Sequence, residues 1–223
     1  MNSIINTWIL VGMVFLAYFL ISYVNMRLGV RNIQNALNTN NGLRLLNLRH
    51  VLGIVLFGVL FYLVLPEKQW LIHSLEIPKL PILLLFIVLV LSCFIISINF
   101  SRKVIVGTDV TSQYSFYDAW LYSIVRLLFL FAYEFFFRGI ILFLLIEHIG
   151  VALGIAVSVG LYFLIHIFDS RKELIGTIPF GIILCFLAYL TKSVWYVFFI
   201  HATLSVAYEL NIFYHKTLKN NKS

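Results

Sequence analysis

The sequence predicts an all-α protein, a polytopic bundle of about seven membrane-spanning helices, from its composition and its long apolar runs. Of its 223 residues, 62% are hydrophobic and only 11% are charged, and the mean hydropathy is +1.00. A soluble domain is about 45–50% apolar and about 25% charged. A single core of this length could not bury so much apolar surface, so the lipid bilayer must be the solvent for most of the chain.

Seven runs are apolar enough to be spanning helices, which need about 20 residues. The second run is short, and the fourth is long enough for an interfacial helix followed by a span, so the number can range from six to eight. The first run has no preceding Lys or Arg and no small-residue cleavage site after it, so we expect a retained helix. The predicted spans are residues 4–24, 50–66, 79–100, 118–146, 150–168, 173–190 and 194–214.

Basic residues concentrate in alternate connections between these spans, whereas the acidic and basic residues of the second connection cancel. Because Lys and Arg favour the cytoplasmic side, we expect the N-terminus outside and the C-terminus in the cytoplasm. The net charge of +7 then reflects loops beside an anionic leaflet, and we expect no nucleic-acid partner. The basic connections carry Arg27, Arg31, Arg44 and Arg49; Arg102 and Lys103; Arg171 and Lys172; and Lys216, Lys219 and Lys222.

Four ionisable residues stand out within the apolar runs. A charged group in a span costs about 2.5–3.5 kcal/mol on insertion scales and usually faces a partner or a cavity. Glu134 and Arg138 are four residues apart and share a helix face, where they can form a structural ion pair or part of a site. His166 and His201 can each be a hydrogen-bonded interior histidine or a functional group. Arg126 is a fifth such residue, which we expect to snorkel toward the cytoplasmic surface.

These side chains form a set with chemical meaning. One carboxylate, one guanidinium, two imidazoles and the Ser205 hydroxyl, one turn after His201, come from three spans. They are the groups needed for attack of water on an amide: a carboxylate removes a proton, a histidine aligns the water or protonates the leaving amine, and donors hold the oxyanion. Taken alone, Ser205 could equally bond back to its own helix.

Three stretches of the sequence carry a resemblance to a known family. Together, in order and spacing, they resemble the motifs of the CAAX-processing and bacteriocin-processing membrane endopeptidases, the CPBP or Abi family. Those motifs are two glutamates, three residues and an arginine, usually followed by glycine; an aromatic residue four before a histidine; and a histidine four before asparagine or aspartate. The stretches here are Tyr133 to Gly139 (YEFFFRG), Tyr162 to His166 (YFLIH) and His201 to Ser205 (HATLS).

The resemblance covers residues 118–210 and implies metal-independent, glutamate-dependent proteolysis within a bacterial plasma membrane. The implied substrate is a small peptide or prepeptide, such as a bacteriocin or toxin precursor, and some similar proteins are associated with self-immunity. It implies that His166 helps to activate water, that His201 donates to the oxyanion, and that Glu134 and Arg138 are the second glutamate and its partner. The chain then divides into N-terminal helices (1–117), a CPBP-like core (118–210) and a basic cytoplasmic tail (211–223).

The sequence departs from the family pattern at two positions. Tyr133 stands where the first glutamate is expected, and a phenol with an ordinary pKa of about 10 is a poor base at neutral pH. Glu134 could take over only through a helix rotation or local unwinding, since adjacent helical residues point about 100° apart. Ser205 replaces asparagine and has a shorter reach. The predicted spans also place His166 and His201 at different depths, so one boundary or tilt must differ if they share a site.

Other functions remain open at this stage. A non-catalytic immunity or peptide-binding protein is favoured by Tyr133, and a small transporter could use the charged residues as a relay, although no inverted repeat is evident. We expect no cofactor; a zinc peptidase using Glu134, His166 and His201 is an alternative that lacks an HExxH motif. Cys93 and Cys185 are predicted to be packing residues. Phe135, Phe136 and Phe137 could line a substrate groove or pack against lipid and neighbouring helices.

Overall fold

A computed structural model describes residues 2–105 and 114–215, and within these residues every regular element is a helix. The elements are α1 (Asn2–Arg27), α2 (Ile33–Asn38), α3 (Gly42–Gly53), η1 (Ile54–Val59), α4 (Leu60–Val64), η2 (Pro66–Lys68), α5 (Trp70–His73), α6 (Leu80–Ile105), α7 (Phe116–Glu134), η3 (Phe135–Ile141), α8 (Leu142–Ile149), α9 (Val151–Ile165), α10 (Arg171–Thr191) and α11 (Val194–Phe213).

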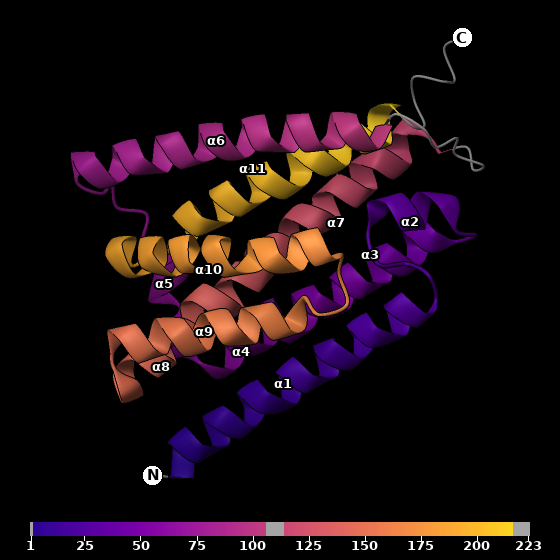
Figure 1. Cartoon of the computed structure of the whole chain (residues 1–223). Coiled ribbons are helices and arrows are strands. Elements are labelled where there is room, and N and C mark those ends of the chain that lie inside the picture. The colour runs from indigo at the N-terminus through magenta and orange to yellow at the C-terminus, as the bar shows by residue number, and fades with distance from the viewer. Residues whose placement is uncertain (1, 106–113, 216–223) are drawn as a thin grey trace.

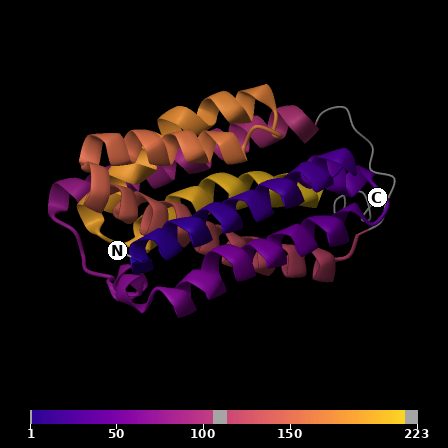
Figure 2. The same ribbon diagram turned by 90° about the horizontal axis from the view of Figure 1, so that it is seen from below.

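The long helices lie lengthwise in one bundle, and the chain connects them only at the two ends (Figures 1 and 2). In the described residues, six helices are long and apolar enough to cross a membrane, and α9, with 15 residues, is a shorter apolar helix. The prediction of a polytopic helical membrane protein with six to eight such helices is therefore confirmed. Because α9 also runs lengthwise, the start of α1 and the end of α11 lie at opposite ends of the bundle (Figure 1).

Several predicted boundaries need correction. The second span begins at Gly42, not at residue 50, because α3, η1 and α4 form one uninterrupted helix to Val64. The fourth run is a single helix from Phe116 to Ile149 with no interfacial break, since its π-helical part continues the backbone hydrogen bonding. The fifth ends at Ile165. Of the predicted tail, residues 216–223 lie outside the described part of the chain.

The fourth span, α7–η3–α8, is the central element of the bundle. Eighty-nine per cent of its most apolar window is buried inside the protein, against 11% for α6, which lies at the periphery. Phe135, Phe136 and Phe137 are fully buried; the ring of Phe57 in η1 stacks on Phe136 at 4.4 Å between centroids. The three phenylalanines therefore pack against neighbouring helices and do not face lipid.

Small residues bring the second span close to α7. A Cβ atom at Gly53 would lie 2.4 Å from the Phe129 ring, and one at Gly58 would lie 2.9 Å from the Cβ of Ala132. Close approach over small residues is a common way for helices to pack in membranes, where no hydrophobic driving force acts between them. The predicted packing role of Cys93 and Cys185 agrees with their buried positions and free thiols.

A second, smaller core closes one end of the bundle. There α2 and the start of α3 pack over the start of α7 and the end of α11. Basic residues also gather at this end, after α1, in the last turn of α6 and at the start of α10 (Figure 1). The alternation of basic connections along the sequence thus places these basic residues at one end of the bundle. The members of this second core are Val30, Ile33, Ala36, Leu37, Leu43, Leu46, Ala119, Tyr122, Ile212 and Phe213.

This arrangement gives a test of the expected orientation. A cysteine introduced at exposed Asn40, between α2 and α3, should be protected from a membrane-impermeant maleimide in intact cells, because basic connections favour the cytoplasm. A cysteine at Ile77, exposed at the opposite end, should be labelled. Wild type, whose two cysteines are buried, is the control. The reverse pattern of labelling would contradict the orientation.

Candidate active site

The Glu134 carboxylate lies at the centre of the bundle and has two partners. Arg138, one turn later, places Nη1 3.3 Å from Oε2 and 3.4 Å from Oε1, and only the Oε1 contact has hydrogen-bond geometry. His201 of α11 contacts Oε1 through Nδ1. A carboxylate only accepts hydrogen bonds, so His201 donates from Nδ1. The predicted Glu134–Arg138 pair is therefore present, and Glu134 also fixes the orientation of one imidazole.

The second imidazole is held in the same way by a different carboxylate. Nδ1 of His166 lies 2.6 Å from Oδ2 of Asp169, and Nε2 of His166 lies 3.0 Å from the hydroxyl of Tyr133. With Nδ1 donating to Asp169, the neutral ring accepts at Nε2 from the phenol. About a quarter of each side chain of the His166–Asp169 pair is exposed, whereas Glu134 has no exposed surface.

Tyr133 lies between the two imidazoles. Its ring centroid is 6.1 Å from that of His166 and 6.0 Å from that of His201. Since Tyr133 and Glu134 are adjacent on one helix, their side chains diverge: the first reaches α9 and the second reaches α11. Tyr133, Glu134, His166 and His201 are thus brought together, but Glu134 pairs with His201 and Tyr133 with His166.

The second motif contributes Tyr162 and the end of α9 to the site. Tyr162, the aromatic residue of the second motif, stacks on Arg138, whose guanidinium carbon lies 4.0 Å from the ring centroid. The depth discrepancy expected between His166 and His201 does not keep them from one site, because the Tyr133 ring reaches both imidazoles. His166 is the C-cap of α9, with φ −94° and ψ 6°, so it turns back toward α7. The predicted end of this span, at residue 168, is wrong.

Ser205 and Arg126 belong to a separate polar cluster. Arg126 donates to both carboxylate oxygens of Glu209, at 2.9 and 3.0 Å, and Tyr122 donates to Oε2 at 2.8 Å. Ser205 accepts from Arg126 at 3.4 Å. The expectation that Arg126 snorkels to the surface is wrong, because an acidic partner lies within reach on α11. Ser205 lies one turn beyond His201 and is engaged by Arg126.

Sequence reasoning missed several polar residues. Asp169 follows His166 by three residues at the end of a helix, a spacing at which the two side chains can meet. Glu209 is, like Glu134, an acidic residue within a predicted span, which is the property that singled out Glu134. His50, 1% exposed, lies beside Arg126 with Nε2 3.2 Å from Nη1. It was missed because the predicted second span began at residue 50, which placed this histidine at the end of a helix and not inside it.

The site geometry does not fit the zinc alternative. Glu134 pairs with His201 and Arg138, whereas His166 pairs with Asp169 and Tyr133. Across residues 2–105 and 114–215, no three His, Cys, Asp or Glu side chains are grouped as a metal site requires. A zinc site generally needs three or four such ligands around one ion.

The fold and site define a multi-pass membrane protein with two carboxylate-oriented histidines in its helix bundle, His201 buried and His166 partly exposed. The family model described as type II CAAX prenyl endopeptidase Rce1-like matches residues 115–207, which coincide closely with the core predicted at 118–210. Over this region the chain is similar to the CPBP family of membrane endopeptidases. None of the curated proteins or solved structures compared with the chain matches it.

The buried ion pair gives a prediction about stability. Glu134→Gln leaves the Arg138 guanidinium buried without its counter-charge, which is expected to cost about 3–5 kcal/mol of unfolding free energy. Combining it with Arg138→Met removes the orphaned charge and should restore much of that loss. The measurement is denaturant unfolding in detergent micelles, with Glu67→Gln at an exposed position as control. A single variant as stable as wild type would contradict the structural role of the pair.

Proposed function

We propose that this protein is an intramembrane endopeptidase that cleaves a small peptide or prepeptide at the site around Tyr133. The supporting observation is that two imidazoles, each oriented by a carboxylate at Nδ1, flank one phenol. A carboxylate at Nδ1 fixes the ring tautomer and stabilises the imidazolium that forms when the other nitrogen takes a proton. Such an imidazole is suited to general acid–base catalysis at neutral pH.

The contacts favour different roles for the two histidines. His166, at the exposed side of the site and hydrogen-bonded to Tyr133, is placed to accept the proton of an attacking water. His201, deeper and fixed by Glu134, is placed to donate to the oxyanion or to the leaving amine. Glu134 orients His201 and does not serve as the base, because it is fully buried and occupied by two partners.

The substrate class rests on the family resemblance and on the position of the site among packed helices. A peptide segment that enters such a site must be short or extended, because a folded domain does not fit between the helices. A bacteriocin or toxin precursor is the substrate that we propose. A role in self-immunity would follow if the same chain cleaved or bound the mature peptide.

A non-catalytic function is the second candidate, and Tyr133 is the observation that favours it. The phenol hydroxyl occupies the Nε2 position of His166 at 3.0 Å, where a water would otherwise be activated. A protein that kept the peptide site and lost hydrolysis would then act as an immunity or peptide-binding protein.

The peptidase function predicts loss of cleavage in either histidine variant. His166→Ala and His201→Ala should each lower the cleavage rate by about 10²–10⁴-fold, the usual contribution of a positioned acid or base. The assay uses the full chain in proteoliposomes of phosphatidylethanolamine and phosphatidylglycerol, a pool of short synthetic peptides as probe, and mass spectrometry of the products. His73→Ala, at an exposed histidine remote from the site, is the control. Unchanged cleavage in both site variants would remove these roles.

The second candidate makes the opposite prediction for Tyr133. Tyr133→Glu supplies a carboxylate beside His166 and recreates the family's paired glutamates. If the protein is a peptidase, wild type should already cleave the peptide pool, and cleavage should persist in the presence of a strong chelator. Wild type that cleaves nothing, together with a Tyr133→Glu variant that gains cleavage, would instead establish the binding function.

A further inference from the structure

Asp169 lies in the short connection between α9 and α10, and hydrogen bonds fix this connection at its α9 end and at its α10 end. The amide of Asp169 donates to the carbonyl of His166 at 3.0 Å, which folds the carboxylate back toward the imidazole. Ser170 caps α10 through a reciprocal capping box with Glu173. The geometry of the turn is therefore set by its own hydrogen bonds, before any contact with a substrate.

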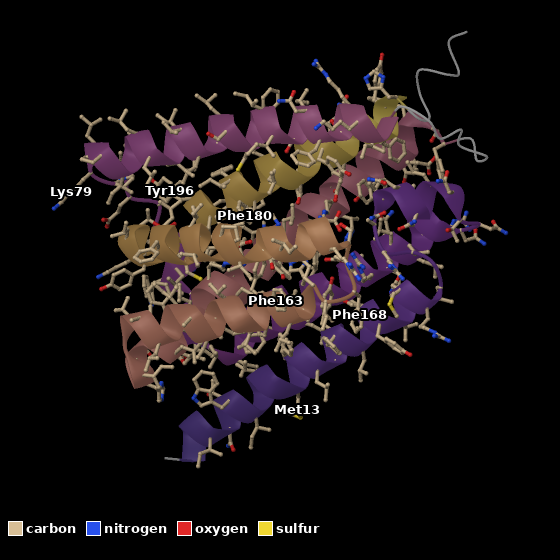
Figure 3. All side chains as sticks on the ribbon, in the orientation of Figure 1. Met13, Lys79, Phe163, Phe168, Phe180 and Tyr196 are labelled. Carbon is tan, nitrogen blue, oxygen red and sulfur yellow. The ribbon has the colours of Figure 1, made fainter. Side chains whose placement is uncertain are left out.

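An aromatic contact anchors the same turn to α1. The ring of Phe168 lies 4.7 Å from that of Phe19 and 5.6 Å from that of Tyr23, between centroids. Figure 3 shows Phe168 at the turn after the end of α9, above α1. Ring pairs at these distances add packing energy beyond simple burial. The turn that bears Asp169 is thus fixed by its own hydrogen bonds and by the packing of Phe168 against α1.

The carboxylate is ionised in this position. Burial alone would raise the pKa of Asp169, but the hydrogen bond from His166 and the positive charges of Arg49 and Arg126 lower it below its ordinary value. An ionised carboxylate at Nδ1 requires the ring hydrogen on that nitrogen, which leaves Nε2 as the acceptor from Tyr133. Carboxylate, imidazole and phenol then form one continuous chain of hydrogen bonds.

We propose that Asp169 is a positioning residue for His166 and that Tyr133 relays a proton between an attacking water and His166; this inference rests on the proposed peptidase function. Water gives a proton to the Tyr133 oxygen as its own oxygen bonds to the substrate carbonyl carbon, and Tyr133 gives its hydroxyl proton to Nε2. The carbonyl π electrons move to the oxyanion. When the carbon–nitrogen bond breaks, the proton returns through Tyr133 to the leaving amine, and carboxylic acid and amine products balance the added water.

The relay gives a chemical role to Tyr133, which stands where the family motif has its first glutamate. In the relay, the phenol need not be a strong base by itself, because Nε2 of His166 takes its proton in the same step. Asp169 offsets the positive charge that then develops on the imidazole, as a carboxylate does in hydrolytic triads. The base thus comes from the chain Asp169–His166–Tyr133, while Glu134 and His201 act on the opposite side of the Tyr133 ring.

The positioning role is tested first without substrate, by the tautomer of His166. The full chain is labelled with ¹⁵N-histidine in micelles, and the signal of His166 among the six histidines is identified by its loss in His166→Gln. Wild type should show hydrogen on Nδ1. Asp169→Asn should shift the neutral ring toward hydrogen on Nε2, and Asp169→Glu should restore the wild-type tautomer. An unchanged tautomer in Asp169→Asn would overturn the positioning role.

Catalysis is the second readout, in the proteoliposome peptide assay. Asp169→Asn should lower kcat by about 10²–10⁴-fold with little change in KM, with partial recovery in Asp169→Glu. Asp118→Asn is the matched control, since Asp118 also bonds to a side chain three residues earlier, Ser115, but lies in the first turn of α7. An unchanged kcat in Asp169→Asn would overturn the proposal.

Tyr133→Phe separates the relay from the positioning role. Removing only the hydroxyl should lower kcat as Asp169→Asn does, and full activity in Tyr133→Phe would overturn the relay. Because the nitrogen signals are read on the protein alone, they decide the role of Asp169 independently of whether any peptide is cleaved. Absence of cleavage by wild type would count against the proposed function, while the tautomer result still stands for or against Asp169.

Discussion

The structure depends on one buried carboxylate. Glu134 has no exposed surface, and in a low-dielectric interior an ionised group must be paired and hydrogen-bonded to remain charged. Arg138 supplies the counter-charge from the next turn, and His201 supplies a donor from α11. This requirement ties the central helix to α11 and fixes the rotation of α7. The π-helix η3 begins directly after Glu134, as such segments often do at functional sites.

Once Glu134 faces α11, the adjacent Tyr133 must face elsewhere, and it faces α9. The two neighbouring residues therefore serve two different histidines, one on each side of the Tyr133 ring. A sequence with two glutamates here would place a carboxylate beside each imidazole. In this chain, Asp169 supplies the carboxylate for His166 and contacts its Nδ1. The Tyr133 phenol contacts the other nitrogen of that imidazole, Nε2. Proteolysis by this site thus requires the phenol to take part in proton transfer or to move aside.

The sequence predicted the helical membrane fold and the Glu134–Arg138 pair, because apolar run length and i, i+4 spacing are local signals. That Glu134 and His201, 67 residues apart, share a site was expected from the chemistry of the set and the family resemblance. It did not predict which imidazole each of Tyr133 and Glu134 would contact, since that depends on helix rotation. The Arg126–Glu209 pair joins residues 83 apart, a tertiary contact that no local pattern reveals. The early end of α9 was missed because Ile167 and Phe168 prolong the apolar run past His166, although the backbone already turns there.

The most direct test of the central claim is the contact between Tyr133 and His166 in a lipid bilayer. Dipolar coupling between ¹³C at Cζ of tyrosine and ¹⁵N at Nε2 of histidine can be measured on the reconstituted full chain by solid-state NMR. A hydrogen bond of 3.0 Å between the Tyr133 oxygen and Nε2 should give a strong coupling that disappears in Tyr133→Phe. No coupling assignable to this pair, or one that survives the substitution, would show that the phenol and the imidazole are apart and would contradict the account.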